Sequence, residues 1–132
     1  MPSHYMLDTD ICSYLMRENP LSLLAKFKEH QERTSISCIT YAELSFGAEK
    51  KGSDRLRAQI TRFASMTGVV DWDAEAALQY ASLRVALTKA GKPIDNMDLM
   101  IAASALSKKY ILVSNNNKHF QHIPGLEFEI WI

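Results

Sequence analysis

The sequence predicts an α/β protein, a three-layer α/β/α sandwich with a mainly parallel central sheet. Short apolar segments rich in β-branched residues alternate along the chain with longer segments of helical periodicity. This alternation is typical of a parallel sheet covered by helices on both faces. The 132 residues suffice for a core, and no linker-like or repeated segment divides them, so we expect one domain over residues 1–132.

In the first half of the chain, four residues mark the expected element ends. Asp10 is placed to cap the first helix, and Pro20 lies at the start of the second. Thr40 and Glu43 have the spacing of a capping box for a later helix, which Gly52 ends. The expected strands are 4–8 and 34–40, and the expected helices are 11–16, 20–30, 40–51 and 54–66.

The second half continues the alternation. Asp73 is placed to cap a long helix that ends before Gly91, and the helix over 95–109 is apolar on nearly all faces, which predicts a central position. The expected strands are 68–72, 110–114 and 126–132, and the expected helices are 74–90 and 95–109. The tail alternates with a period of two, which predicts an edge strand with one solvated face. Its predicted apolar face holds Leu126, Phe128, Ile130 and Ile132, against Glu127, Glu129 and Trp131.

Three acidic residues are expected to meet at one edge of this sheet. Asp8 ends the first strand, Glu43 follows the second strand by one turn, and Asp98 lies in the first turn of the apolar helix. Ligands of parallel sheets bind at the carboxyl ends of the strands, where these side chains can converge. Glu43 has a structural explanation in the capping box and Asp98 in a helix N-terminus, whereas Asp8 has none.

Carboxylates that converge on a buried edge need a positive partner. No Lys or Arg is adjacent in sequence to Asp8, Glu43 or Asp98, so the expected partner is a hard divalent cation, Mg²⁺ or Mn²⁺. Asp10 is a further candidate, as an outer ligand or as a residue that holds a metal-bound water. In the segment "SNNNKHF", Asn116 can offer an amide oxygen to a metal-bound water, and it can equally be an ordinary turn residue.

Four short motifs occur together in a fixed order. They are "LDTD" at 7–10, "TxxEL" at 40–44, "DLMIAA" at 98–103 and "SNNxxxF" at 114–120. Each motif alone is weak, but in this order they span nearly the whole chain. The set resembles the PIN domain and, more narrowly, the VapC-type toxins of bacterial toxin–antitoxin pairs.

The resemblance implies a metal-dependent endoribonuclease toxin. Asp8, Glu43 and Asp98 correspond to the metal-binding acids of the family, and Asn116 joins them as a candidate catalytic residue. The resemblance also implies a homodimer and a VapB-type antitoxin, which wraps the toxin with an amphipathic helix and places a basic side chain in the acidic pocket. Relatives of the enterobacterial type cleave the anticodon loop of initiator tRNA, so a structured RNA such as that tRNA is the expected substrate.

Two places depart from the family pattern. Asp10 stands where the family usually has Asn, which adds negative charge to the site. Asn116 and His119 stand where the last motif often supplies an acid, so a second metal ion is expected to bind weakly or only together with substrate. His119 is expected in a loop without a third ligand for zinc.

Three other activities share parts of this pattern. A phosphatase of the haloacid dehalogenase type has a similar D-x-D opening, but it needs a late pair of acids that "SNNNKHF" lacks. A phospho-accepting signalling module needs a Lys after its last strand, and Lys118 lies too far into the following segment. A structure-specific DNA nuclease of related fold would carry long insertions to grip a duplex, and this chain has none.

The net charge of zero hides an uneven distribution. Of 15 acidic residues, the four candidate site acids leave 11, against 15 Lys and Arg, so the remaining surface is mildly basic. Basic residues concentrate after the second motif at Lys50, Lys51, Arg55, Arg57 and Arg62. Such residues hold phosphates in nucleic-acid-binding proteins, and they also occur on ordinary solvated helix faces.

The sequence also bears on the compartment. No signal peptide is evident and no apolar run approaches membrane-spanning length, so we expect a cytoplasmic protein without membrane association. Cys12 and Cys38 are expected to be reduced thiols.

Overall fold

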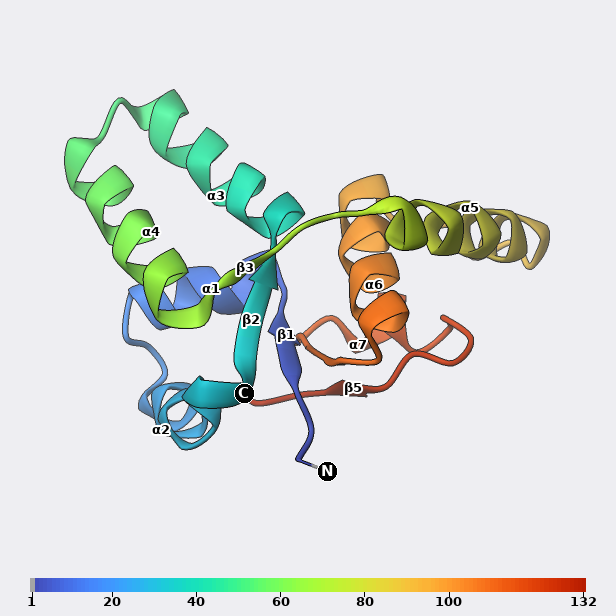
Figure 1. Cartoon of the computed structure of the whole chain (residues 1–132), viewed down its shortest axis with the longest axis horizontal. Helices are drawn as coiled ribbons and strands as arrows, with labels where there is room; N and C mark the ends of the chain where they lie inside the picture. The colour runs from blue at the N-terminus through green and yellow to red at the C-terminus, as the bar shows by residue number, and fades with distance from the viewer. Residues whose placement is uncertain (1) are drawn as a thin grey trace.

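The structure, a computed structural model, describes residues 2–132 and confirms the α/β prediction. Within that range, five parallel strands form one sheet in the order β3-β2-β1-β4-β5 (Figure 1). The strands are β1 (Tyr5–Leu7), β2 (Thr34–Ser37), β3 (Val69–Val70), β4 (Ile111–Val113) and β5 (Phe128–Glu129). The helices are α1 (Thr9–Met16), α2 (Leu21–His30), α3 (Cys38–Lys51), α4 (Asp54–Thr67), α5 (Ala74–Lys89), α6 (Asn96–Lys108) and α7 (Asn117–Phe120), with a 3-10 turn at Gln31–Arg33.

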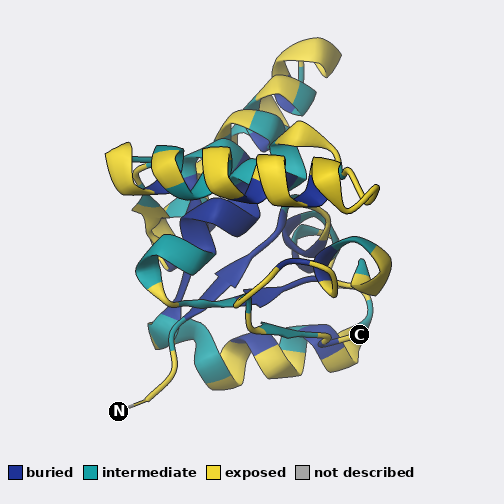
Figure 2. Ribbon diagram, turned by 90° about the vertical axis from the view of Figure 1, so that its right-hand side faces the viewer, coloured by how far each residue is buried: buried dark blue, intermediate teal, exposed yellow. Residues whose placement is uncertain are grey.

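Helices cover both faces of the sheet, and each face buries its own apolar core (Figure 2). Successive side chains of a strand point to opposite faces, so Tyr5 and Leu7 pack with α1 to α4 while Met6 packs with α5 and α6. This arrangement is the predicted three-layer sandwich. None of the helices formed by residues 2–132 combines the length and the hydropathy needed to cross a membrane.

Helix α6 is the central helix that the sequence predicts. Its residues 101–105 are all buried, and three of those five are alanines, whose small side chains let the helix lie close to the sheet and to α5. Because α6 is held on several sides, its first turn has a defined position. That turn carries Asp98.

The strand order reverses between β1 and β4. The chain first extends the sheet from β1 to β2 and β3, and then crosses to the other side of β1 to form β4 and β5. The carboxyl ends of β1 and β4 are therefore neighbours, and the Asp8 amide donates to the Val113 carbonyl at 3.0 Å. In doubly wound sheets this reversal creates the crevice where ligands bind.

The structure corrects the predicted end of the second strand, the capping box of the following helix and the loop around His119. The second strand ends at Ser37 rather than at residue 40, because the Ser37 hydroxyl accepts a hydrogen bond from the Ile39 amide at 3.1 Å and caps α3. Thr40 therefore lies inside α3, and no capping box joins it to Glu43. The segment around His119 is the short helix α7 rather than a loop.

The predicted alternation of the tail ends with β5, which contains only two residues. Trp131 is 5% exposed, and its ring lies 5.2 Å from the Tyr5 ring and 5.4 Å from the His30 ring. Ile130 and Ile132, expected on the buried face, are 48% and 49% exposed. After Glu129 no strand hydrogen bonds keep alternate side chains on opposite faces. Trp131, the largest apolar side chain of the tail, is therefore buried instead of the two isoleucines.

We predict that Trp131→Ala lowers the free energy of unfolding by about 3 kcal/mol, because a buried indole is removed and a cavity remains. Ile132→Ala is the matched control, and as a surface substitution it is expected to change stability by less than about 0.5 kcal/mol. Urea unfolding of the two variants measures the difference. Equal effects would contradict the burial of Trp131.

Candidate functional site

Asp8 lies where β1 leads directly into α1. Its Oδ1 accepts a hydrogen bond from the Ile11 amide at 2.9 Å, so Asp8 caps this helix. The sequence prediction that Asp10 is the cap and that the helix begins at Ile11 was wrong. Both aspartates satisfy the local capping rule, and the choice depends on where β1 ends. Asp10 is exposed in the first turn, on the same edge of the sheet.

Asp8 is strongly desolvated, with only 4% of its surface exposed. Burial raises the pKa of its carboxyl to about 6, and the charges of Asp10 and Asp98 add to that rise. Hydrogen bonds from the Ser114 side chain and the Ile11 amide act in the opposite direction. Asp8 thus caps a helix. Capping alone does not explain why its carboxyl is buried and lies near two other acids.

Glu43 lies in the second turn of α3 and points toward α1. Thr9 Oγ1 donates to Glu43 Oε1 at 2.6 Å, and the same hydroxyl lies 3.4 Å from Thr40 Oγ1. Thr9 therefore fixes one carboxylate oxygen of Glu43. Sequence reasoning missed Thr9, although it lies between the two aspartates of "LDTD" and is the hydroxyl residue nearest the site in sequence.

Asp98 does not cap α6. Asp95 is the cap, and its carboxylate accepts from the amides of Met97 and Asp98 at 3.1 and 3.3 Å. Burial raises the pKa of the Asp98 carboxyl, and the charges of Asp95, Glu43 and Asp10 raise it further. Asp98 therefore lies in the electrostatic field of the other predicted site acids.

Asn116 and His119 approach this site from the segment after β4. The side-chain Nδ2 of Asn116 lies 2.9 Å from His119 Nδ1, and the backbone N–H of Asn116 donates to Ser114 Oγ at 2.9 Å. His119 Nδ1 also lies 3.7 Å from Asp98 Oδ2, an ion pair when the ring is protonated, which opposes the rise in the pKa of Asp98. Sequence reasoning gave His119 no contact with an acid. Its place in the last motif was the available signal.

The structure thus places Asp8, Asp10, Glu43 and Asp98 at one edge of the sheet. Among residues 2–132, none of these four acids pairs with Lys or Arg, and the ion pair to His119 is the one they make. Also within that range, no three His, Cys, Asp or Glu side chains form a ready-made cluster of metal ligands. Mg²⁺ is commonly held by one or two carboxylates and several waters, so this oxygen-rich, dispersed set fits such an ion.

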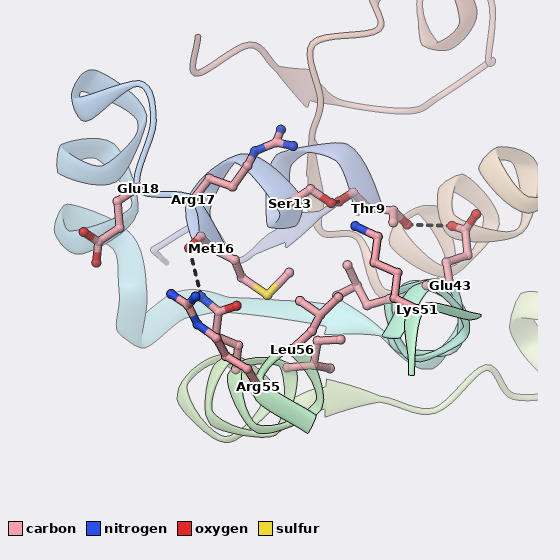
Figure 3. A pocket seen from close by; sticks show the side chains of 13 residues that line it. Thr9, Ser13, Met16, Arg17, Glu18, Glu43, Lys51, Arg55 and Leu56 are labelled. Carbon is pink, nitrogen blue, oxygen red and sulfur yellow. Dashed lines mark hydrogen bonds between the residues drawn. The ribbon is translucent and has the colours of Figure 1, made fainter. Parts of the chain in front are cut away.

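A pocket of about 720 Å³ begins beside Glu43 and extends between α1, α3 and α4 (Figure 3). Thr9 and Glu43 lie at one end of it, and Arg17 and Arg55 lie toward the other. Of the predicted site acids, Glu43 alone lines it within the described chain. The pocket is therefore an extension of the acidic site and does not contain it.

The chain is similar in sequence and fold to known proteins. Residues 5–126 match the PIN domain family. The chain is 38% identical to the tRNA(fMet)-specific endonuclease VapC of Shigella flexneri, over 96% of this chain and 97% of that protein. It is also 38% identical to ribonuclease VapC2 of Haemophilus influenzae, over 97% and 98% of the two chains. The crystal structure of DNA-bound VapBC from Salmonella typhimurium superposes with a TM-score of 0.92 and 35% identity, covering 99% of this chain and 100% of that one.

These similarities confirm the resemblance drawn from the four motifs. They give no support to the haloacid-dehalogenase-like phosphatase or to the phospho-accepting signalling module, which share only the opening acids.

We predict that Asp8→Asn stabilises the metal-free protein, most strongly at neutral and alkaline pH. The folded-state pKa of Asp8, about 6, exceeds the ordinary value of 3.8, so the folded state of the parent loses stability as pH rises between these two values. The variant does not titrate, and Asn still caps the helix. Its gain is therefore absent below about pH 4 and complete above about pH 7, with an upper bound of about 3 kcal/mol.

Chemical unfolding in EDTA at several pH values measures this gain. Glu32→Gln, which removes an exposed carboxylate just before β2, at the opposite edge of the sheet, is the control and is expected to change stability by less than about 0.5 kcal/mol. A loss of stability in Asp8→Asn at pH 8 would show that the carboxylate is needed for folding.

Proposed function

This chain belongs to the PIN-domain family, in its VapC group, and we propose that it is a metal-dependent endoribonuclease toxin restrained by a VapB-type antitoxin. One observation carries the proposal. Asp8, Glu43 and Asp98 come from three separate segments at one edge of the sheet, where the charge of Asp98 raises the pKa of Asp8 and the charge of Glu43 raises the pKa of Asp98. Among residues 2–132 none of the three has a Lys or Arg partner. Carboxylates that repel one another destabilise a packed core, whereas a site that binds a cation requires them as ligands.

We assign the metal to Asp8 and Asp98, with Glu43 as a third ligand or as a base, and with Asp10 and Asn116 in the outer shell. Carboxylate and amide oxygens are the donors that Mg²⁺ and Mn²⁺ prefer. When bound, such an ion lowers the pKa of water, orients the phosphodiester and offsets charge in the transition state. The buried, mutually repelling carboxylates support this assignment because a divalent cation relieves the repulsion.

The residues around the acids have supporting roles. Thr9 holds one oxygen of Glu43 and leaves the other oxygen free to orient the attacking water and accept its proton. His119 lies beside Asp98, where a protonated ring limits the negative charge of the site before substrate enters. When His119 Nδ1 carries no proton, the side-chain amide of Asn116 can donate a hydrogen bond to it.

The proposed substrate is a structured RNA, with the anticodon loop of initiator tRNA as the first candidate. The name of the Shigella flexneri relative specifies that tRNA, and this chain is similar to it over nearly its whole length. An unpaired loop presents splayed nucleotides whose phosphodiester can enter a narrow site, whereas a duplex does not.

The proposed antitoxin neutralises the acids that the toxin leaves unpaired. An Arg inserted by a partner among Asp8, Asp10 and Asp98 would take the place of the metal and block the substrate. The structural neighbour from Salmonella typhimurium is a VapBC complex bound to DNA, which supports a VapB-type partner for this chain. We also propose that the toxin is a homodimer.

We predict that Mg²⁺ or Mn²⁺ stabilises the metal-free protein against heat. An ion that binds only the folded state adds about 2.7 kcal/mol at a concentration one hundred times its Kd. The thermal shift is expected to shrink in Asp8→Ala, and to remain in Glu32→Ala, which removes an exposed carboxylate just before β2, at the opposite edge of the sheet. No response of the parent to either ion would refute the proposed metal site.

We predict that the purified protein with Mg²⁺ or Mn²⁺ cuts initiator tRNA at one dominant position in the anticodon loop. Asp98→Asn keeps the size of the side chain and removes its charge, so it is expected to abolish cleavage without loss of thermal stability. Mapping of new RNA 5′ ends after induction in cells tests the same cut among all transcripts.

Different outcomes refute different parts of the proposal. Uniform decay of messenger RNA with intact tRNA would refute the substrate and leave the nuclease. Cleavage of DNA without cleavage of RNA would refute both. An unfolded Asp98→Asn variant would show that Asp98 has a structural role.

A further inference from the structure

We propose that Lys51 and Arg55, with Arg17, form a phosphate-binding subsite that holds the RNA backbone beside the scissile bond. The inference rests on the proposed ribonuclease function and adds to it the path of the substrate. The subsite is the cationic part of the 720 Å³ pocket between α1, α3 and α4, whose near end is formed by Thr9 and Glu43 (Figure 3).

The three cations are available for a ligand. Lys51 ends α3, Arg55 lies in the first turn of α4, and Arg17 follows α1, and all three are exposed. Across the described residues 2–132, none of them forms an ion pair, although Arg17 stacks on the Tyr14 ring at 5.0 Å from its centroid.

Arg57 provides a contrast on the same α4 helix. Its guanidinium pairs with Glu49 at 2.7 Å and with Asp54 at 2.6 Å, so its charge serves the α3–α4 hairpin. In the sequence Arg55 and Arg57 look equivalent. Among residues 2–132 of the structure Arg57 forms ion pairs and Arg55 forms none.

The helix α3 sets the distance between the subsite and the acids. Lys51 follows Glu43 by eight residues, so their Cα atoms are about 12 Å apart along the helix, and both side chains line the same pocket. A phosphate held by Lys51 and another at the acidic site would therefore belong to the same short stretch of backbone. Between them Gly47 lines the pocket, and a Cβ built on it would have no neighbour within 4 Å.

Gly47 lowers the stability of α3 relative to alanine, and packing within the protein does not require a glycine there, because a Cβ would contact nothing. A glycine inside a helix is about 1 kcal/mol less favourable than alanine. The open space above it leaves the α3 backbone accessible to a ligand, as occurs where glycine permits close approach. Gln59 lines the same wall and donates one N–H to the Met16 carbonyl at 3.3 Å, which leaves its second N–H for a phosphodiester oxygen.

The test compares Lys51→Gln and Arg55→Gln with Lys89→Gln in cleavage of the tRNA loop or of an RNA oligonucleotide that contains it. Lys89 ends α5, which packs on the opposite face of the sheet, and serves as the charge-matched control (Figure 1). Each pocket variant is expected to raise KM about fourfold near 0.15 M salt, with kcat nearly unchanged. It is also expected to lower the slope of log affinity against log salt by about 0.7, the value for one lost single-strand phosphate contact.

A second measurement uses the unaltered protein. RNA oligonucleotides that each carry one neutral methylphosphonate are cleaved in parallel, and one position outside the scissile bond is expected to raise KM as much as Lys51→Gln or Arg55→Gln does. Combining that substrate with the matching variant is expected to add nothing further, because both changes remove the same contact.

The outcomes separate the subsite from the proposed function. If the parent cleaves no RNA, the ribonuclease proposal fails and the subsite fails with it. If the parent cleaves RNA and both pocket variants match Lys89→Gln, the subsite alone is refuted. If these variants cleave normally but escape inhibition by the antitoxin, the pocket is a protein-docking surface and not an RNA path.

Discussion

The Asp8 carboxylate at the end of β1 is nearly without solvent, and it lies in the field of Asp10 and Asp98. Desolvation and like charge both disfavour its ionised form, so the fold has to supply the free energy that holds it there. That free energy comes from the two apolar cores on either side of the sheet and from the Asp8 amide, which bonds to Val113 across the switch point. The same cost makes the site selective for a ligand with concentrated positive charge.

Each acid is placed by a different element, and other residues carry the structural duties nearby. Ser37 caps α3 and Asp95 caps α6, so Glu43 and Asp98 remain free for chemistry. Asp8 does both tasks: one oxygen accepts from the Ile11 amide, and the charge lies on the shared edge. Removing a charge from such a set relieves repulsion, which is the physical basis of the trade-off between stability and activity in sites of this kind.

The helix α3 joins two surfaces of opposite charge. Its beginning presents Glu43 to the acidic edge, and its end presents Lys51 to the pocket shared with α1 and α4. A polyanion attracted by the cations would lie beside carboxylates that repel it. The proposed divalent cation would remove this repulsion, because it reverses the local sign of the charge.

The sequence by itself determined the fold class, the parallel sheet, the buried helix with Asp98 and the position of Asp8, Asp10, Glu43 and Asp98 at one edge of the sheet. These follow from apolar periodicity and from residues at strand ends, which are local properties of the chain. The tertiary structure decided which aspartate caps α1, because that depends on where β1 stops pairing with β4. It also decided the contact of Thr9 with Glu43, the approach of His119 to Asp98 and the burial of Trp131 in place of Ile130 and Ile132. Each of these joins segments distant in sequence, or depends on a strand too short to keep its period, so no local pattern specifies it.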